Sequence, residues 1–371
     1  MSEFSRLVAS AGASIEAEDD FEAINELFGA RGWSDGLPIV PPTAERVERM
    51  LAYCDRPWGE PIAAIPPRYG AATPLRLAIN AVMAGCRPEY FPLIVLAIEA
   101  ICEEKFNLYG IQTTTHPCSP MIIVNGPVAA ELGINCGHNA FGPGVRSNAT
   151  IGRAIRLALL NIGGAIPGLG DMSTVGSPAK YTYCVAENEA ASPWEPLHVE
   201  LGFTTETSTV TVVGAEGPHN INDHESVTAE GILTTIAGTV AITGTNDVFY
   251  LDQAQPLVVM GPEHAATVAR GGYSKAAAKR FLHEHAQLPL GRFSNENIER
   301  RLRKKYPERY ADKDALVPMA QSPDKFMIVV LGGAGKHSAF VPTFGITSAV
   351  TRALKLSDGQ LARSVEAFKR N

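Results

Sequence analysis

Two apolar segments with the same succession of residues constrain the fold of this chain more than any other feature. Residues 119–130 read Ser-Pro-Met-Ile-Ile-Val-Asn-Gly-Pro-Val-Ala-Ala, and residues 255–266 read Gln-Pro-Leu-Val-Val-Met-Gly-Pro-Glu-His-Ala-Ala. An uninterrupted apolar run of this length predicts a strand that is buried on both faces. Glycine then permits a sharp turn, and proline is favoured at the first position of a helix. The two segments therefore predict an α/β fold of two pseudo-repeated halves, with apolar strands that end in glycine turns and helices packed on the sheets.

The same pattern predicts how the chain is divided. We expect a flexible arm at residues 1–20 and a helical and extended N-terminal region at residues 21–115. A central polar, glycine-rich half would follow at residues 116–225, and a second α/β half with a C-terminal helix at residues 226–371. Because Gly-Pro follows strands in many unrelated folds, a chance likeness of the two halves stays open.

Composition and charge exclude several classes of partner. The 371 residues carry a formal net charge of −7, whereas binding to nucleic acid or to an anionic membrane requires a clustered basic surface. The basic run at residues 300–305 lies among glutamates and predicts the solvated face of a helix. No apolar run reaches the roughly 18 residues that cross a bilayer, and the first residues lack the pattern of a signal peptide. We expect a cytoplasmic protein with no nucleic-acid or membrane partner, and the apolar content is compatible with a homodimer.

Cys184 is the first candidate for chemistry. It is expected at the end of a strand and is followed by Glu187, Asn188 and Glu189. A cysteine becomes nucleophilic when a base or a positive field favours its thiolate. The groups that could do this are Lys180, His116, His138, His198 and His219. The alternative is a buried structural cysteine.

Glu187 and Glu189 form the second candidate. Residues two apart on a strand point to the same side, so these carboxylates are expected to lie together. Two carboxylates can divide acid and base roles when their environments differ. The alternative is a solvated acidic turn.

The remaining candidates are histidines and groups that could bind a substrate. His116, His138 and His219 are expected to polarise a substrate or transfer protons, or else to be hydrogen-bonded loop residues. A metal ion held by these three across loops is a further alternative, although H-E-x-x-H and paired C-x-x-C motifs are absent. The sequence therefore does not identify a cofactor, and a metal ion stays an alternative. The residues expected to bind a polar or carboxylated substrate are Asn125, Arg146, Asn148, Lys180 and Lys336.

Glycine turns at Gly126, Gly261 and residues 332–335 are expected to lead into helices, whose free N–H groups suit a carboxylate or a phosphate. Lys336 adds positive charge to the last of these turns. Because Lys336 is followed by His337, the turn is not a P-loop, and it does not fit G-x-G-x-x-G either. No nucleotide cofactor is therefore expected.

Several long motifs resemble those of one family. Residues 33–43, Trp-Ser-Asp-Gly-Leu-Pro-Ile-Val-Pro-Pro-Thr, resemble the W-[ST]-D-G-L-P-x-V-P-P-T segment of an uncharacterised bacterial family. Residues 180–189, 193–200 and 261–265 resemble later segments of that family, so the likeness runs over most of the chain. Members occur beside or fused to small thiol or selenol proteins with a [UC]-G-S-C motif. The resemblance implies an enzyme and thiol chemistry, and since this chain has no Cys-Gly-Ser-Cys run, such a partner would be a separate polypeptide.

Together these features predict an enzyme that acts on a small polar or carboxylated molecule. The expected reaction is cysteine- or carboxylate-assisted hydrolysis or lysis of a C–N or C–S type bond, so a hydrolase or lyase is favoured over an oxidoreductase. One alternative is a redox component that works with a separate thiol or selenol partner protein. Another is a non-catalytic protein that binds a small molecule.

Overall fold

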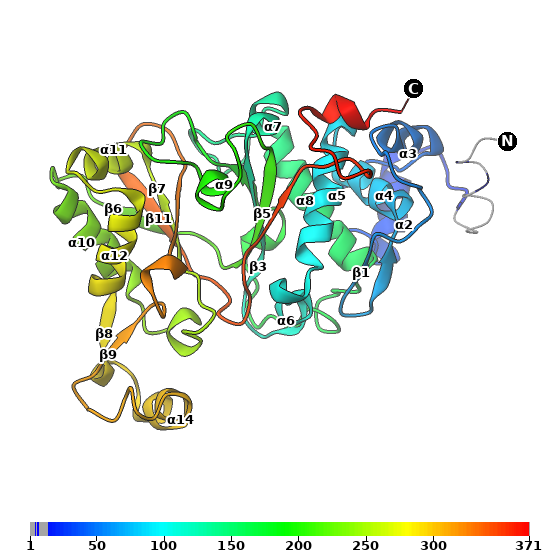
Figure 1. Ribbon diagram of the computed structural model, residues 1–371. Coiled ribbons are helices and arrows are strands. Elements are labelled where there is room, and N and C mark those ends of the chain that lie inside the picture. Colours follow the sequence, from blue (N-terminus) through cyan, green and yellow to red (C-terminus); the bar gives the residue numbers. More distant parts are fainter. Residues whose placement is uncertain (1–3, 5, 7–13, 371) are drawn as a thin grey trace.

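Two four-stranded mixed sheets form the centre of the protein, and helices cover their outer faces (Figure 1). This computed structural model describes residues 4, 6 and 14–370. The predicted α/β fold is confirmed. Most of the expected arm at residues 1–20 lies outside the described residues. None of the helices in the described part combines the length and the apolar character that crossing a bilayer requires.

The two sheets have the same pattern of strand pairing. In the first sheet the order is β12-β5-β3-β4, with bounds Val350–Ala353, Thr209–Ala215, Ser119–Asn125 and Cys184–Ala186. In the second sheet the order is β6-β11-β7-β10, with bounds His219–Asn222, His337–Val341, Leu257–Met260 and Met327–Val330. β3 and β4 are parallel, as are β7 and β10, and all other pairs are antiparallel. The duplication of the two halves stays a prediction.

Each half gives one strand to the sheet of the other. β6 follows β5 in the chain but pairs with β11, and β12 follows β11 but pairs with β5. The expected boundary at residue 225 therefore does not separate the two sheets. This exchange connects the halves through backbone hydrogen bonds as well as through side-chain packing.

The sheets pack face to face, because every second residue of a strand points to the same side. Residues on the inner faces form one apolar layer between the sheets, which includes Met121, Ile123, Val185, Val213, Leu257, Val259, Val329 and Val341. The intervening residues, such as Ile122, Val124, Val258 and Ile328, point outward into the helices. The layers follow the order helices, sheet, sheet and helices. Both faces of each central strand are therefore buried, which explains the uninterrupted apolar runs.

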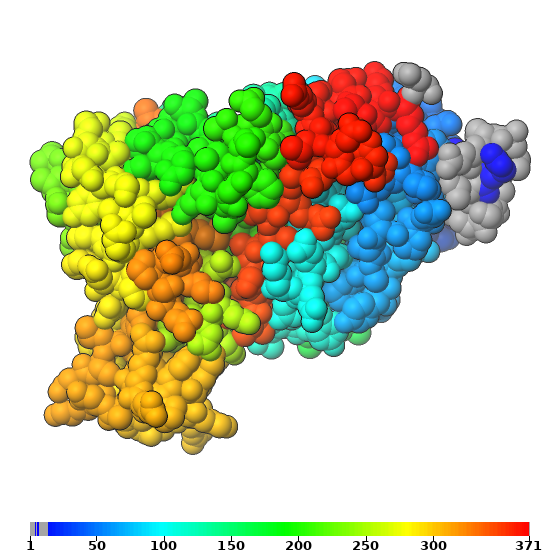
Figure 2. Space-filling model, in the orientation of Figure 1, coloured from blue at the N-terminus to red at the C-terminus, as the bar shows by residue number. Residues whose placement is uncertain are grey.

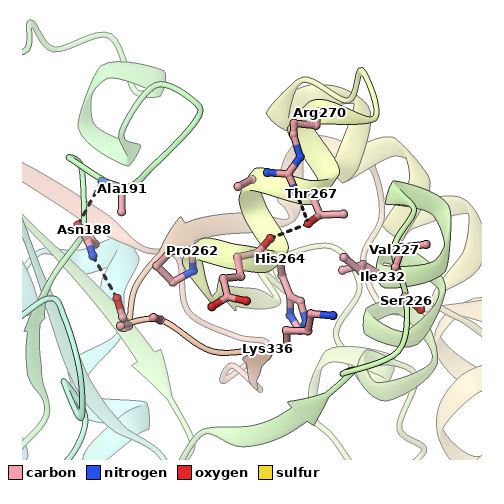
Figure 3. Close-up of a pocket in the computed structure, with 15 residues that line it drawn as sticks. Asn188, Ala191, Ser226, Val227, Ile232, Pro262, His264, Thr267, Arg270 and Lys336 are labelled. Carbon is pink, nitrogen blue, oxygen red and sulfur yellow. Dashed lines mark hydrogen bonds between the residues drawn. The ribbon is translucent and has the colours of Figure 1, made fainter.

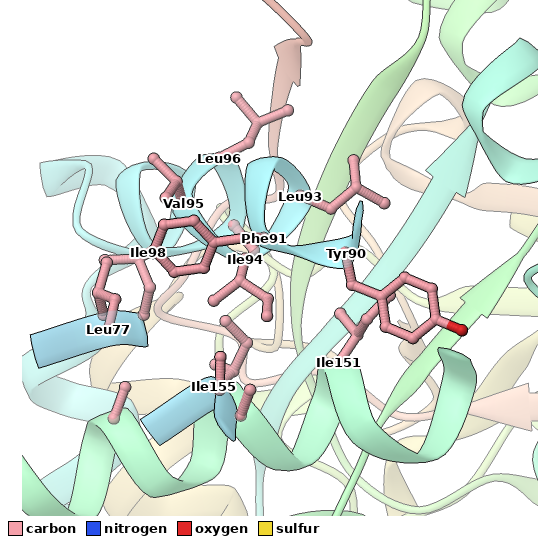
Figure 4. Packing of buried hydrophobic residues seen from close by; sticks show 14 of the residues in the cluster. Leu77, Tyr90, Phe91, Leu93, Ile94, Val95, Leu96, Ile98, Ile151 and Ile155 are labelled. Carbon is pink, nitrogen blue, oxygen red and sulfur yellow. The ribbon is translucent and has the colours of Figure 1, made fainter. Parts of the chain in front are cut away.

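Three helices form the layer beside the first sheet: α5 (Phe91–Ile101) and α8 (Arg146–Asn161) pack on its outer face, and α4 (Pro74–Ala84) packs against both of them. α5 lies in the middle of this layer, and all of its residues except Glu99 are buried. Its side chains pack against Leu77 of α4 and Ile151 and Ile155 of α8 (Figure 4). A helix that is apolar on all sides is stable only when it is surrounded in this way.

On the outer face of the second sheet lie α10 (Ala229–Val240) and α12 (Lys275–His285), and α11 (Pro262–Arg270) packs against α10. A small lobe projects from this half, as Figure 2 shows in yellow and orange, and it contains the hairpin β8–β9 (Gln287–Pro289 and Leu316–Pro318). The other elements are α2 (Phe21–Ala30), α3 (Ala44–Leu51), β1 (Ala63–Ile65), β2 (Gly70–Ala72), α6 (Leu108–Thr113), α7 (Pro127–Glu131), α9 (Leu197–Glu200), α13 (Asn295–Asn297) and α14 (Arg303–Lys305).

Two sequence-based expectations about local structure are wrong. The expected C-terminal helix is not formed by residues 352–370: this segment begins in β12, and its only helical turn is a 3-10 turn at Val365–Phe368. β12 is a strand because it pairs with β5, which is remote in sequence, so the local sequence does not indicate it. Gly126 and Gly261 do lead into α7 and α11, but residues 332–335 lead straight into β11. Gly332 and Gly335 have φ values of 115° and 133°, which let the chain reverse there.

We predict that Gly126→Ala destabilises the protein more than Gly133→Ala. Both glycines have positive φ, 81° and 58°, which costs an alanine about 1–2 kcal/mol. An added Cβ meets nothing within 4 Å at Gly133, but at Gly126 it would lie 2.5 Å from the carbonyl oxygen of Thr207. This overlap should add about 1–3 kcal/mol to the loss in free energy of unfolding. Urea denaturation measures both values, and equal losses would contradict the close packing at Gly126.

Candidate functional site

Three polar side chains meet where the parallel strands β3 and β4 end. Asn125 is the last residue of β3, and Glu187 and Glu189 follow β4 directly. The Asn125 Nδ2 donates hydrogen bonds to Glu187 Oε2 at 2.7 Å and to Glu189 Oε1 at 3.0 Å. Parallel strands bring their carboxyl ends to the same edge, so one amide can hold both carboxylates. We call Asn125, Glu187 and Glu189 the acidic cluster.

The two carboxylates have different surroundings. Glu187 is buried, with 4% of its surface exposed, and accepts hydrogen bonds from the N–H of Leu197 at 2.8 Å and of Val330 at 3.4 Å. Burial raises its pKa, although the charge of Lys275 and these hydrogen bonds oppose the rise. The Glu189 side chain is 29% exposed, and its Oε1 accepts a hydrogen bond from Gly126 N at 2.7 Å.

His198 adds unused hydrogen-bonding groups beside the cluster. It lies on α9, is fully buried, and its Nδ1 is 3.8 Å from Glu189 Oε1. Within the described residues, neither ring nitrogen of His198 has a hydrogen-bond partner, and neither does Asn125 Oδ1. Buried polar atoms are rarely left unpaired in proteins, and such atoms often mark places where water or a ligand binds.

A cleft of about 580 Å³ opens next to the acidic cluster. Figure 3 shows Asn188 and Ala191 on one side of α11 and Ser226 and Val227 on the other. The glycine turn at residues 332–336 lines it as well. Such a volume is typical of sites for small molecules.

Asn188 fixes one wall of this cleft. Its N–H donates to Val330 O at 2.8 Å, and its Nδ2 donates to Gly332 O at 3.1 Å. The end of β4 in the first sheet therefore meets the end of β10 in the second. The cleft lies at the carboxyl ends of parallel strands of both sheets.

Three charged side chains line the cleft: Glu263, Arg270 and Lys336. Glu263 Oε1 accepts a hydrogen bond from Gly335 N at 2.7 Å, Arg270 donates to Thr267 Oγ1 at 2.8 Å, and Lys336 donates to His224 O at 2.6 Å. Arg270 and Lys336 can each form further hydrogen bonds, because a guanidinium has five N–H groups and an ammonium has three. The cleft therefore offers both signs of charge to a ligand.

His264 forms a fixed, buried part of the cleft. Its Nε2 lies 3.0 Å from Asp223 O, an oxygen that only accepts, so Nε2 carries a proton. Its Nδ1 lies 2.8 Å from Ser338 Oγ, which also accepts the N–H of Gly261 at 3.0 Å. When the Ser338 hydroxyl donates to Nδ1, the two ring nitrogens of His264 and the Ser338 oxygen all have hydrogen-bond partners, with a single proton on the ring. We interpret His264 as a residue that positions the start of α11.

Cys184 lies away from these groups, in the hydrophobic core. It begins β4 instead of ending a strand, and its side chain lies in the apolar cluster on the helix-covered side of the first sheet. Burial raises the pKa of the thiol, so the thiolate is disfavoured. In the described residues, no hydrogen bond joins Cys184 to an imidazole.

The other sequence candidates are divided between the site and distant positions. His138 lies against Gly333 of the glycine turn, where an added Cβ would overlap its ring. Asn148 positions the preceding loop by accepting from Asn135 N at 2.7 Å and donating to Asn135 O at 2.9 Å. Four candidates lie elsewhere. His116 pairs with Glu216 at 2.6 Å, and Lys180 pairs with Asp171 at 2.7 Å. His219 is exposed on β6, and Arg146 donates a hydrogen bond to Gly85 O at 2.9 Å.

The metal alternative has no suitable group of ligands in the described part of the chain. No three His, Cys, Asp or Glu side chains there are placed to hold a metal ion. His116, His138 and His219 have separate neighbours, as given above.

Three residues near the site were not selected from the sequence. Glu263 lies in the Gly-Pro-Glu-His motif, which was used only to infer a helix start, and Arg270 has no local signal. Cys136 is half-buried, and its carbonyl oxygen accepts the N–H of Gly332 at 2.9 Å. Burial raises the pKa of Cys136, and the nearby charge of Glu189 adds to the rise.

No protein-family model matches the chain, and the search of curated proteins gave no match.

We predict that Glu187→Gln alters the pH dependence of stability. Since folding raises the pKa of Glu187, the folded state binds this proton more tightly, and the contribution of Glu187 to stability should fall as pH rises above about 4.3, the unfolded value. Glutamine cannot ionise, so the variant should gain stability relative to wild type between pH 5 and 8. The measurement is the urea midpoint across this range.

Asp223→Asn is the matched control. Although burial opposes it, hydrogen bonds from Thr235 Oγ1 and Ser226 N lower the pKa of Asp223. Its stabilising effect is lost only as pH falls below about 4, so the difference between this variant and wild type should be constant above pH 5. A constant difference for Glu187→Gln as well would show that Glu187 is ionised normally.

Proposed function

We propose that this protein is an enzyme that binds a small carboxylated molecule in the cleft and acts on it by acid–base chemistry. One observation carries the proposal: Lys336, Arg270 and Glu263 line a single cleft at the carboxyl ends of parallel strands from both sheets. In α/β folds, ligands bind in the crevice outside the carboxyl ends of the strands. The reaction class remains hydrolysis or lysis of a C–N or C–S type bond.

Lys336 and Arg270 are the proposed carboxylate-binding groups. They lie toward opposite ends of α11 (Figure 3), so a substrate could be held at one or both ends. Lysine and arginine are cationic side chains that donate hydrogen bonds to carboxylates, and an arginine can do so through two parallel hydrogen bonds. The lysine is partly fixed by its bond to His224 O, which reduces the entropy lost on binding.

Glu263 is the proposed acid–base group. One oxygen is held by the N–H of Gly335, and its other oxygen accepts no hydrogen bond from the described residues. That oxygen is available to a substrate in the cleft. The carboxylate part of the sequence-based hypothesis is thereby kept, while the buried Cys184 is left out. In this proposal Glu187 and Glu189 act through Asn125 and Asn188 to position the wall of the cleft.

The remaining expectations complete this proposal. We infer a cytoplasmic enzyme with a small-molecule substrate and neither a nucleotide cofactor nor a nucleic-acid partner. The net charge of −7 and the absence of nucleotide-binding motifs support these inferences. A homodimer stays a prediction.

We predict that Lys336→Met weakens carboxylate binding at least tenfold. The probes are succinate and pimelate, titrated calorimetrically into the full chain, with low-millimolar binding expected for wild type. Lys304→Met removes the same charge from the exposed basic run and should bind like wild type. Unchanged binding by Lys336→Met would remove Lys336 from the site.

Catalysis has a separate test. Wild type is screened against amides and thioethers that carry a carboxylate, and Glu263→Gln is compared on any that turn over. The variant should lose at least a hundredfold in kcat with little change in KM, because a general base contributes roughly 10²–10⁴-fold. Unchanged kcat would exclude this role for Glu263. Tight binding with no product from any compound would favour the non-catalytic binding protein.

A second candidate function, a redox component with a separate thiol or selenol partner, is favoured by Cys136. Cys136, which is half-buried whereas Cys184 is buried, lies in the segment that packs on the glycine turn of the cleft, although burial raises the pKa of this thiol as well. In such a protein the Cys136 thiolate would attack a partner disulfide, forming a mixed disulfide and releasing the other sulfur as a thiolate.

We predict that a Cys-Gly-Ser-Ser peptide, activated at its cysteine as a thionitrobenzoate disulfide, forms a mixed disulfide with Cys136. One equivalent of coloured thionitrobenzoate would be released, and peptide mapping would locate the adduct. Cys136→Ser should abolish the reaction, and Cys184→Ser should leave it unchanged because that thiol is buried. An adduct at another cysteine, or none, would count against this function.

A further inference from the structure

Four arginines converge on a second hollow, on the helical side of the first half. This hollow has a volume of about 310 Å³ and is lined by Arg46, Arg49, Arg87 and Arg146, which we call the arginine pocket. The arginines come from α3, from the turn after α4 and from the start of α8. Of the residues that line it, none is acidic, and none also lines the cleft of the proposed function.

The charges in this pocket are largely unbalanced. Guanidinium groups do not lose their proton in proteins, so four positive charges share a small volume in a chain whose net charge is −7. The ion pair that Arg49 makes with Glu45 is 3.9 Å long and highly exposed, and such a pair contributes little. Like charges that lie near one another repel, less so where solvent screens them, and an anion between them relieves the repulsion.

Two of the guanidinium groups are fixed in place by the backbone. Arg46 donates through one Nη to Pro41 O at 2.9 Å, and Arg146 donates through Nε to Gly85 O at 2.9 Å. Each contact leaves the other N–H groups of the guanidinium available. Because these side chains are already ordered, a ligand would lose less entropy on binding.

The conspicuous segment at residues 33–43 builds part of this pocket. Arg153 binds both carboxylate oxygens of Asp35 at 2.8 Å, and both side chains are largely buried. Val40 N donates to Met83 O at 3.1 Å, and Val40 lines the pocket. The segment thereby places Pro41 O where it holds Arg46. The cleft uses no residue of this motif, so the arginine pocket gives the motif a role of its own.

We propose that the arginine pocket binds a compact multivalent anion, a phosphate or a di- or tricarboxylate. Arginine suits both because its planar fork matches phosphate and carboxylate oxygens. The volume of about 310 Å³ suits a small anion better than a macromolecule. This binding is independent of the proposed function.

The experiment titrates pyrophosphate and citrate separately into the full chain at low salt, with detection by calorimetry. At least one anion should bind with a Kd below 1 mM, and the tighter of the two identifies the phosphate or the carboxylate source. Arg146→Met and Arg46→Met should weaken that anion at least tenfold. Arg87→Met, which removes an exposed side chain, provides the same test if the other variants fold poorly.

One control decides the site. Arg300→Met removes an equal charge from the exposed lobe and should bind the anion within twofold of wild type. The proposal is overturned if neither anion binds, or if Arg300→Met weakens binding as much as Arg146→Met does. Failure of carboxylate binding in the cleft would leave this result unaffected, so the two proposals stand or fall separately.

Discussion

The rest of the structure depends on the apolar contact between the two sheets. Aliphatic residues from the inner faces, such as Ile123 and Val185 of the first sheet and Val259 and Val329 of the second, form one closed layer. Their burial is worth roughly 1.5–3 kcal/mol for each side chain. This contact holds the end of β4 against the end of β10, where Asn188 binds Val330 and Gly332. The candidate site exists because the sheets are stacked in this register.

Much of the architecture could be predicted because it is encoded locally. The apolar runs at residues 119–124 and 257–260 are strands, and Gly-Pro after each run starts a helix. Two further features depended on remote partners and were missed. β12 is a strand only because β5 offers it an edge, and the glycine turn at residues 332–335 reverses into β11 instead of starting a helix.

The site was predictable in part for the same reason. Asn125, Glu187 and Glu189 are polar residues at strand ends, so the chain itself indicates that they meet. The position of Cys184 could not be inferred, because both faces of β4 are apolar and the alternation that would tell one face from the other is absent. Glu263 and Arg270 face the cleft only because α11 lies beside a loop from the other half.

The exchange of edge strands has a consequence for the order in which the molecule can assemble. β5 is synthesised long before β12, so its outer edge has no partner until residues 350–353 have left the ribosome. An unpaired strand edge is a template for association with other chains. The first sheet can therefore be completed only after residues 350–353 have emerged, and the outer edge of β5 must stay protected until then.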